Sequence, residues 1–409
     1  LSLAAARPVA ADAPPAQQAA RADAPPATRA EAIAQTRAAK AERLQPYRPG
    51  TLEKALLKIE NDRLIEQLLA GRGGTFYLRW GFGHSGAGHA IGPGLQWPNL
   101  LGGRLQLRTD AVASLKRYWD VRARAALPEL AGGRVFVEIE ARRRSMPQED
   151  FFGLGPASRR PDRVSFRLDE TRIGGTAGVR LPPLGAGGGL EFLDPGVGRG
   201  RDRLLPSIEE RFDDVTAPGL AEQPRFLVYR AFGEIDYARP AGNPRRGGRY
   251  LVTASRYSDR DLGRYSFDRL DVDLRQYLPF LQERRVIVLR GLVSLSSPDV
   301  GARVPFYLQR TLGGHNTLRG FRDYRFRDTH LLLLQAEYRW EILPALDAAL
   351  FYDTGKVVPR ARDLSLRDLE RDWGFGFRFG TNAGVFLRID AAFGSRDGPH
   401  LFIKFSNVF

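Results

Sequence analysis

From Thr75 to the end of the chain, apolar and polar residues alternate with a period of two. This period is typical of β-strands that have one apolar and one polar face. In the clearest segment, Trp373–Gly380, an aromatic residue takes every second position, with glycine or arginine between. The pattern predicts sixteen strands, most of them about ten residues long. They lie at 75–84, 104–115, 117–127, 133–145, 163–171, 173–183, 187–196, 223–237, 248–258, 264–279, 284–298, 330–341, 345–357, 371–380, 383–394 and 400–408.

Two features of these strands favour a closed barrel in a membrane over a soluble antiparallel sheet, which also alternates. Charges of both signs lie in the middle of the polar faces, as a water-filled lumen allows. Large aromatic residues, such as Tyr338, Trp340 and Trp373, lie near strand ends, as in the girdles at a membrane interface. A closed barrel satisfies its backbone groups in lipid because it has no edge. A soluble β-rich binding protein is the alternative, and detergent dependence would separate the two.

The connections between the predicted strands differ in length on the two sides of the sheet. Four long connections, at 85–103, 197–222, 299–329 and 358–370, fall on one side if the strands simply alternate in direction. The other side has mostly short turns, as expected for an outer-membrane barrel. The connection 146–162 breaks this pattern, because it is long and falls on the short-turn side.

The residues before the first strand have a different composition. Residues 1–50 are rich in alanine and proline and are expected to be flexible, because they cannot bury a core. We interpret Leu1–Ala6 as the end of a signal-peptide apolar region and Val9–Ala11 as its cleavage site; the alternative is a plain Ala/Pro-rich tail. Residues 51–73 are expected to form one short periplasmic helix. Its apolar residues fall on two flanks, so it either docks onto the following domain or is a frayed linker.

Composition excludes several classes of protein. No apolar run approaches the roughly 18–20 residues of a spanning helix. The chain has no cysteine, which excludes a disulfide scaffold and a thiolate metal site. Its net charge is +15, and 56 of the 62 basic residues are arginine. Because acidic residues are interspersed with these arginines, we expect no nucleic-acid partner.

The chain shows no pattern of catalytic or metal-binding residues. Its five histidines have no metal-site spacing, and there is no Gly-x-Ser-x-Gly motif to supply a nucleophile. The carboxylates interleave with arginine along the polar strand faces, which indicates ion pairs on a barrel wall rather than acid–base catalysis. We therefore predict no enzyme activity, no catalytic residue, no cofactor and no metal.

Three short motifs carry a family resemblance. The connection 299–329 contains Leu318-Arg319-Gly320-Phe321. The second predicted strand after this connection, 345–357, contains Phe351-Tyr352-Asp353-Thr354-Gly355. A third segment, Asp150–Gly155, reads Asp-Phe-Phe-Gly-Leu-Gly. In order and spacing these motifs resemble the BamA/TamA-like bacterial surface antigen superfamily of outer-membrane β-barrels. The likeness covers roughly residues 74–409 and includes Phe405 and Phe409, which it identifies as a C-terminal assembly signal.

The resemblance implies that the loop folds into the lumen and that Arg319 meets the strand motif. An arginine that loses water inside a barrel needs a carboxylate. By the alternation, Asp353 and Glu337 both lie on the lumen face, together with Phe351 and Gly355. Without the motif, Arg319 would be one solvated arginine among many.

The resemblance also implies a location and a function. We expect a barrel over 74–409 in the bacterial outer membrane, in contact with membrane lipid and lipopolysaccharide and folded by the barrel assembly machinery. Family members that act in assembly and secretion carry POTRA modules before the barrel. Residues 1–73 have no room for such a module, so we expect a POTRA-less member. A separate periplasmic protein would then complement it. The favoured function is protein or lipid insertion or translocation. A gated pore for small solutes and a non-transporting surface-exposed barrel remain alternatives.

Overall fold

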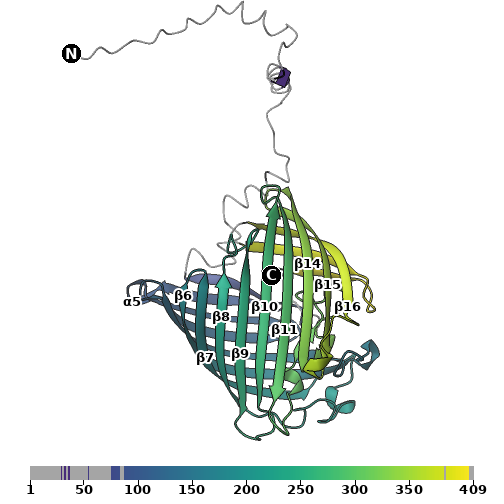
Figure 1. The fold of residues 1–409 in the computed structure, drawn as a ribbon. Coiled ribbons are helices and arrows are strands. Elements are labelled where there is room, and N and C mark those ends of the chain that lie inside the picture. The colour runs from purple at the N-terminus through teal and green to yellow at the C-terminus, as the bar shows by residue number, and fades with distance from the viewer. Residues whose placement is uncertain are drawn as a thin grey trace, which may run out of the picture. The chain divides into compact units, whose positions relative to one another are not determined.

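The computed structural model describes residues 75–82, 87–381 and 384–404, together with five isolated positions before residue 55. Sixteen strands form one antiparallel sheet in which neighbours follow the order of the chain. The sheet curls into a barrel (Figure 1), so the predicted all-β fold and its strand number are confirmed. The predicted flexible segment 1–50, the helix 51–73 and the terminal Phe405 and Phe409 lie outside the described residues, apart from those five positions.

The strands of the barrel have the following bounds: β1 Phe76–Phe82, β2 His89–Asn99, β3 Leu105–Ser114, β4 Trp119–Leu130, β5 Val135–Phe151, β6 Val164–Leu181, β7 Leu184–Arg199, β8 Phe226–Asp236, β9 Gly247–Asp259, β10 Phe267–Phe280, β11 Arg285–Pro298, β14 His330–Leu343, β15 Leu346–Val358, β16 Glu370–Thr381, β17 Gly384–Phe393 and β18 His400–Lys404. Short helical turns lie in the connections: α5 Leu100–Gly103, η1 Arg160–Asp162, η2 Ile208–Glu210, η3 Phe306–Leu308 and η4 Ala361–Asp363. In the N-terminal unit, Leu1–Lys54, the Thr36 hydroxyl donates a 2.7 Å hydrogen bond to the carbonyl of Ala32.

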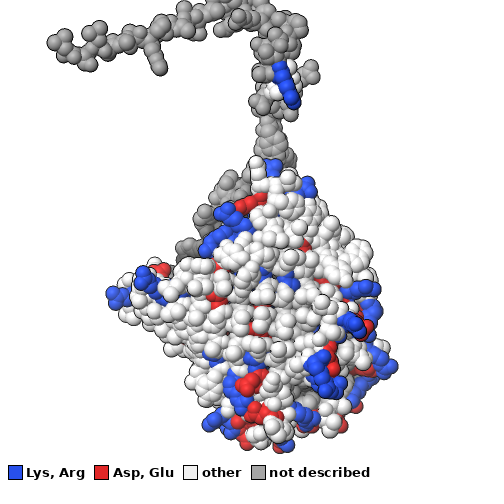
Figure 2. All heavy atoms as spheres, in the orientation of Figure 1, with Lys and Arg blue, Asp and Glu red and all other residues white. Residues whose placement is uncertain are grey.

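The two faces of each strand differ as the alternation predicts. On β15, Leu350 and Tyr352 point outward and are 50% and 45% exposed, whereas Phe351 and Asp353 point inward and are buried. On the side of the molecule drawn in Figure 2, charged side chains gather near the end with the long connections and are sparse over the middle of the strands. No helix among the described residues is long and apolar enough to cross a membrane.

The predicted strand positions are wrong at β2, which lies inside the segment 85–103 that we expected to be a loop. The glycines and prolines of this strand do not interrupt it, and two of the glycines allow close packing against neighbouring strands. A Cβ on Gly92 would lie 1.8 Å from the Ala111 carbonyl oxygen, and a Cβ on Gly94 would lie 2.2 Å from the Tyr77 ring. A glycine inside a strand can mark such a close approach.

A second error concerns β6, which we predicted as two strands, 163–171 and 173–183. It is one strand of 18 residues that pairs with β7 from Phe166 to Leu181 without a break. The two errors cancel in the number of strands. They reverse the predicted direction of the strands that lie between β2 and β6. With both corrected, the segment between β5 and β6 joins the other long connections at one end of the barrel, and the irregularity at 146–162 disappears.

One connection at the short-turn end also folds over the lumen. Residues 237–246 join β8 to β9, and Arg245 reaches Asp347 at the start of β15 with two hydrogen bonds of 2.7 and 3.1 Å. Asp347 is buried and pairs in register with the inward Arg378. Ala238 packs against three further buried residues of β10 and β11, namely Tyr277, Val286 and Val288.

Candidate functional site

The connection between β11 and β14, residues 299–329, forms a two-stranded ribbon of β12 (Arg310–Leu312) and β13 (Phe326–Asp328) with a tight tip. Gly313 and Gly314 begin the tip with φ of 113° and 93°, which side chains with a Cβ rarely adopt. The Gly314 amide donates to the carbonyls of Leu318 and Phe321, which closes the turn around Arg319. The sequence therefore fixes the shape of the segment that carries the arginine.

Arg319 lies fully buried between the loop tip and the barrel wall. Its Nε and Nη2 donate to the two carboxylate oxygens of Asp353 at 2.6 and 2.8 Å, and its Nη1 donates to Glu337 at 2.7 Å. Its guanidinium also stacks over the Phe351 ring, 3.5 Å from the ring centre. Burial alone would lower the pKa of Arg319, but Asp353 and Glu337 outweigh burial and raise this pKa above its usual value. The side chain is a permanently charged anchor.

The strand motif fits this anchor residue by residue. Phe351, Asp353 and Gly355 are alternate residues of β15, so they share the inward face. Phe351 stacks on the guanidinium and Asp353 binds it bidentately. A Cβ on Gly355 would lie 2.5 Å from the Leu332 carbonyl and 3.1 Å from the Leu312 side chain. Glycine there makes room for the loop against the wall.

The residues beside Arg319 pack the tip against the wall. Leu318 and Phe321 are completely buried in an apolar cluster with residues of the ribbon, β14 and β15. Phe321 makes an edge contact with Phe326, with ring centres 5.1 Å apart. A Cβ on Gly320 would lie 2.5 Å from Cβ of Asp372, so the backbone approaches β16 at this residue. The structure thus packs all four residues of the loop motif between the ribbon and the barrel wall, and brings Arg319 onto the strand motif.

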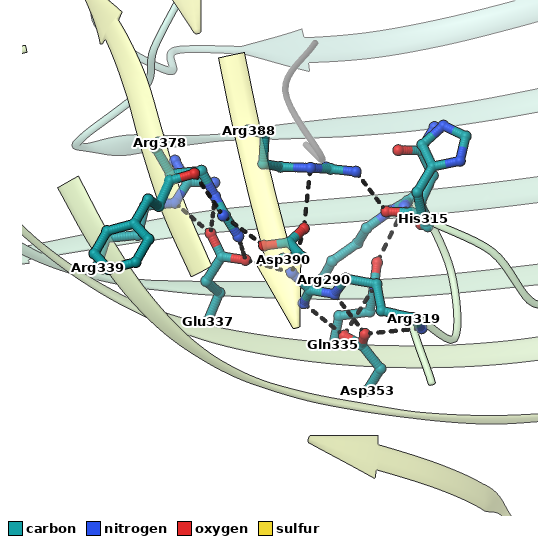
Figure 3. A network of polar contacts seen from close by, with 12 residues as sticks. Arg290, His315, Arg319, Gln335, Glu337, Arg339, Asp353, Arg378, Arg388 and Asp390 are labelled. Carbon is teal, nitrogen blue, oxygen red and sulfur yellow. Dashed lines mark hydrogen bonds and ion pairs between the residues drawn. The ribbon is translucent and has the colours of Figure 1, made fainter. Parts of the chain in front are cut away.

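Glu337 is the centre of a wider network (Figure 3). Besides Arg319, it accepts hydrogen bonds from Arg339 at 2.7 Å and from Arg378 at 2.8 Å. Arg378 also donates to Asp390 at 2.6 Å. One carboxylate therefore joins the loop to two neighbouring positions of the wall.

Arg388 and Gln335 of the barrel wall bind the backbone of the loop tip. Arg388 forms an ion pair with Asp390 at 3.0 Å and donates to the His315 carbonyl in the tip at 2.7 Å. Gln335 donates to the Thr317 carbonyl at 2.8 Å and to Asp353 at 3.0 Å. Backbone carbonyls of the tip are thus satisfied by wall side chains, which fixes its position.

The network joins seven buried charged residues through ion pairs, and each of the seven is at most 2% exposed. They are Arg319, Arg339, Arg378, Arg388, Glu337, Asp353 and Asp390. The loop supplies Arg319, and its removal would leave Asp353 without an ion pair among the described residues. The alternation places most of these residues on the lumen face, but it does not show which of them Arg319 meets.

The third motif lies at the base of the loop. Phe151 packs against Phe306 of η3 with ring centres 5.1 Å apart, and the Gly155 amide donates to the Arg327 carbonyl at 2.9 Å. Phe151 and Phe306 belong to an apolar cluster near the long-connection end of the barrel. Burial lowers the pKa of Arg327 to about 10. Among the described residues there is no group of acids and histidines that could hold a metal.

Residues 241–397, which include the loop and the strand motif, match the model of the Omp85 superfamily domain. This part of the chain is an Omp85 superfamily domain. The match confirms the resemblance inferred from the motifs. Omp85 proteins are transport and insertion proteins of the bacterial outer membrane rather than enzymes, and the matched residues 241–397 place this domain in that membrane. A comparison with curated proteins finds no match.

Two solved Omp85-type barrels share the fold. One is BamA from Haemophilus ducreyi lacking POTRA domains 1–3, with a TM-score of 0.59 and 13% identity, over 81% of this chain and 69% of that chain. The other is CdiB from Escherichia coli, with a TM-score of 0.51 and 16% identity, over 80% of this chain and 61% of that chain. At these identities the likeness establishes the barrel fold.

Proposed function

We propose that this Omp85 barrel inserts or translocates protein or lipid at the outer membrane, with the loop 299–329 as an internal latch. The buried contact of Arg319 with Asp353 and Glu337 carries this proposal. A passive wall would not need a fully desolvated arginine on a long loop. A network of buried ion pairs can hold the loop in one position and release it when a substrate competes.

The lumen beside the latch supports passage of a substrate. Inward residues of β5 to β8 line a cavity of about 200 Å³, which includes Glu138, Glu140, Arg172 and Glu191. The side chains of Arg172 and Glu191 keep 26% and 20% exposure, in contrast to the desolvated network on the opposite wall. The loop therefore fills one side of the lumen and leaves the other polar and accessible.

The first and last strands offer a second route, sideways into the membrane. β1 pairs with β2 and β18 pairs with β17, and within the described residues β1 and β18 do not pair with each other. An unpaired strand edge can template the pairing of another chain. We propose that a β-strand substrate pairs at this seam between β1 and β18.

The chain contains no cysteine, so engineered disulfides test the proposal cleanly. Cysteine pairs that join residues 76–82 to residues 400–404 would lock the seam, and a pair at Leu95 and Thr109, register partners on β2 and β3, is the matched control. Proteoliposomes with the reduced protein should speed the folding of a urea-unfolded outer-membrane β-barrel protein to its protease-resistant form. Oxidation should stop this in the seam variant and not in the control. No acceleration over protein-free liposomes would contradict the insertion function.

The accessible side of the lumen also favours a second candidate, a gated pore for small solutes. A latch would then control conductance rather than insertion. A large steady current through the intact protein in a planar bilayer, without any effect on substrate folding, would favour the pore.

A further inference from the structure

A cluster of cations lies at the long-connection end of the barrel, away from the loop latch. The β3–β4 turn supplies Lys116 and Arg117, and the segment after β7 supplies Arg201 and Arg203. Together they line a cleft of about 410 Å³ that contains one acid, Asp202. The Asp202 carboxylate accepts the Leu204 amide at 2.8 Å. The cleft therefore carries a formal charge of +3.

The backbone holds the two segments of the cleft against one stretch of β5. The Tyr118 hydroxyl donates to the Gln148 carbonyl at 2.7 Å, and the Arg201 amide donates to the Pro147 carbonyl at 2.9 Å. These neighbouring anchor points fix the spacing between the cations of the turn and those of the segment. The cluster is thus a built feature rather than a chance meeting of loops.

The four cations differ from other exposed arginines at the same end of the barrel. Arg225, Arg264 and Arg360 are 52–62% exposed, and each pairs with an acid. Within the described residues, Lys116, Arg117, Arg201 and Arg203 are exposed and make no ion pair. Four like charges with only one acid among them repel one another, so the cleft is stabilised when an anion binds.

The cleft lies on the outward side of the barrel. To reach Pro147 on β5 from the end of β7, the segment must cross β6. Gly200 lies against Ser165, which alternates with the inward Val164 and Phe166 and so points outward. Trp119, directly after the turn, is outward and 36% exposed, as tryptophan is at a membrane interface.

Two leucines flank the cations and are almost completely exposed. Leu115 is 104% exposed and Leu204 is 92% exposed. Full burial of a leucine side chain is worth about 1.5–3 kcal/mol. Exposed leucines beside unpaired cations at an interface fit a ligand that has both anionic groups and acyl chains.

We propose that this cleft binds lipopolysaccharide of the outer leaflet. Long connections face the outside in outer-membrane barrels, so the cleft lies at the level of that leaflet. Lys116, Arg117, Arg201 and Arg203 contact the phosphate groups of the glycolipid, while Leu115 and Leu204 contact its acyl chains. The site is independent of the transport function and would hold the barrel in a defined lipid environment.

Purified full-length protein in neutral detergent would be titrated with hexa-acylated lipid A that carries two phosphates. The test variant combines K116Q, R117Q, R201Q and R203Q. The control combines R159Q, R225Q, R264Q and R360Q, which removes the same charge from exposed, ion-paired arginines of the same end. A heat-dependent gel shift checks that both variants fold. The wild type and the control should bind alike, and the test variant should bind at least about tenfold more weakly, as expected for lost charge-assisted contacts.

Three comparison ligands make the result decisive. Lipid A without phosphate and zwitterionic phosphatidylethanolamine should bind the wild type as weakly as they bind the test variant. Inorganic phosphate should displace lipid A poorly, since it cannot contact Leu115 and Leu204. Efficient displacement by phosphate would mean a general anion site and would overturn the lipid assignment. Equal losses in the test and control variants, or no loss in either, would overturn the site.

Discussion

Replacement of Arg319 by alanine tests the latch directly. The side chain is completely buried, donates two hydrogen bonds to Asp353 and one to Glu337, and stacks on Phe351. Its loss leaves the buried Asp353 without an ion pair among the described residues. Gln335 remains as a donor to Asp353 at 3.0 Å, but it brings no charge.

The expected cost follows from the buried charge that stays behind. Removing one partner of a buried ion pair costs about 3–5 kcal/mol, because the other partner keeps its desolvation penalty. The cost should fall on the closed position of the loop, because Arg319 is the charge that the loop contributes to the buried network. At about 1.4 kcal/mol for each factor of ten, the open population should rise by roughly two to three and a half powers of ten. Arg319→Lys keeps the charge but loses the bidentate fork, so its effect should be intermediate.

The assay is cleavage of residues 299–329 by externally added subtilisin in proteoliposomes, since cleavage follows the open population when opening is fast. Arg303→Ala is the matched control. Arg303 lies in the same connection and pairs with Asp214 at 2.8 Å, but its side chain is 45% exposed, so its loss should cost about 0–1 kcal/mol. If Arg319→Ala and Arg303→Ala are cleaved at the same slow rate as the wild type, Arg319 is not an anchor.

Three further predictions follow from the barrel and its connections. Unheated protein should run faster than boiled protein on a detergent gel because a barrel stays compact until heated; an unheated band of folded protein at the boiled position would contradict a barrel. The current through the intact protein in a planar bilayer should be small, and it should be carried mainly by anions because arginine is in excess. The conductance should rise on removal of residues 1–73 if that segment plugs the lumen. A large, steady, cation-selective current would contradict this. Hydrogen bonds from Arg225 lower the pKa of Asp261 to about 2. The stability that this contact adds is therefore fully present above pH 4, about the pKa of an aspartate in the unfolded chain, and is lost as the pH falls through 2. Pepsin should therefore cleave 260–266 faster in Asp261→Asn than in the wild type at pH 4, with the difference gone below pH 2; equal rates at pH 4 would refute the pairing.

The sequence predicts the second half of the barrel better than the first. β14 to β17 alternate large apolar residues with charges, so their positions and faces follow directly from the period. β2 and β7 contain many glycines and prolines. These residues interrupt the alternation of apolar and polar side chains, so the period of two is hard to recognise in both strands. Glycine is required at such positions because a side chain of the neighbouring strand occupies the space, as the Tyr77 ring does at Gly94. Such a requirement belongs to the folded pair of strands and leaves no sign in either strand alone.

The site shows the same limit at the level of single side chains. Alternation places Asp353 and Glu337 on the lumen face, and the motif names Arg319 as their partner. It does not indicate that Arg378 reaches Glu337, because Arg378 lies on β16 and Glu337 on β14, with β15 between them. It also gives no sign that Arg245 crosses the short-turn end to reach Asp347.

These two long-range contacts act from opposite ends of the barrel. The loop 299–329 enters from the long-connection end and residues 237–246 enter from the short-turn end, and both are fixed to β15, at Asp353 and Asp347. Because these aspartates are six residues apart on one strand, they share the inward face, about 20 Å apart at the rise of a β-strand. A displacement of β15 would therefore strain both anchors together. The inward face of β15 thus anchors both connections. Under the proposed function, a substrate that competes for this face would release both of them.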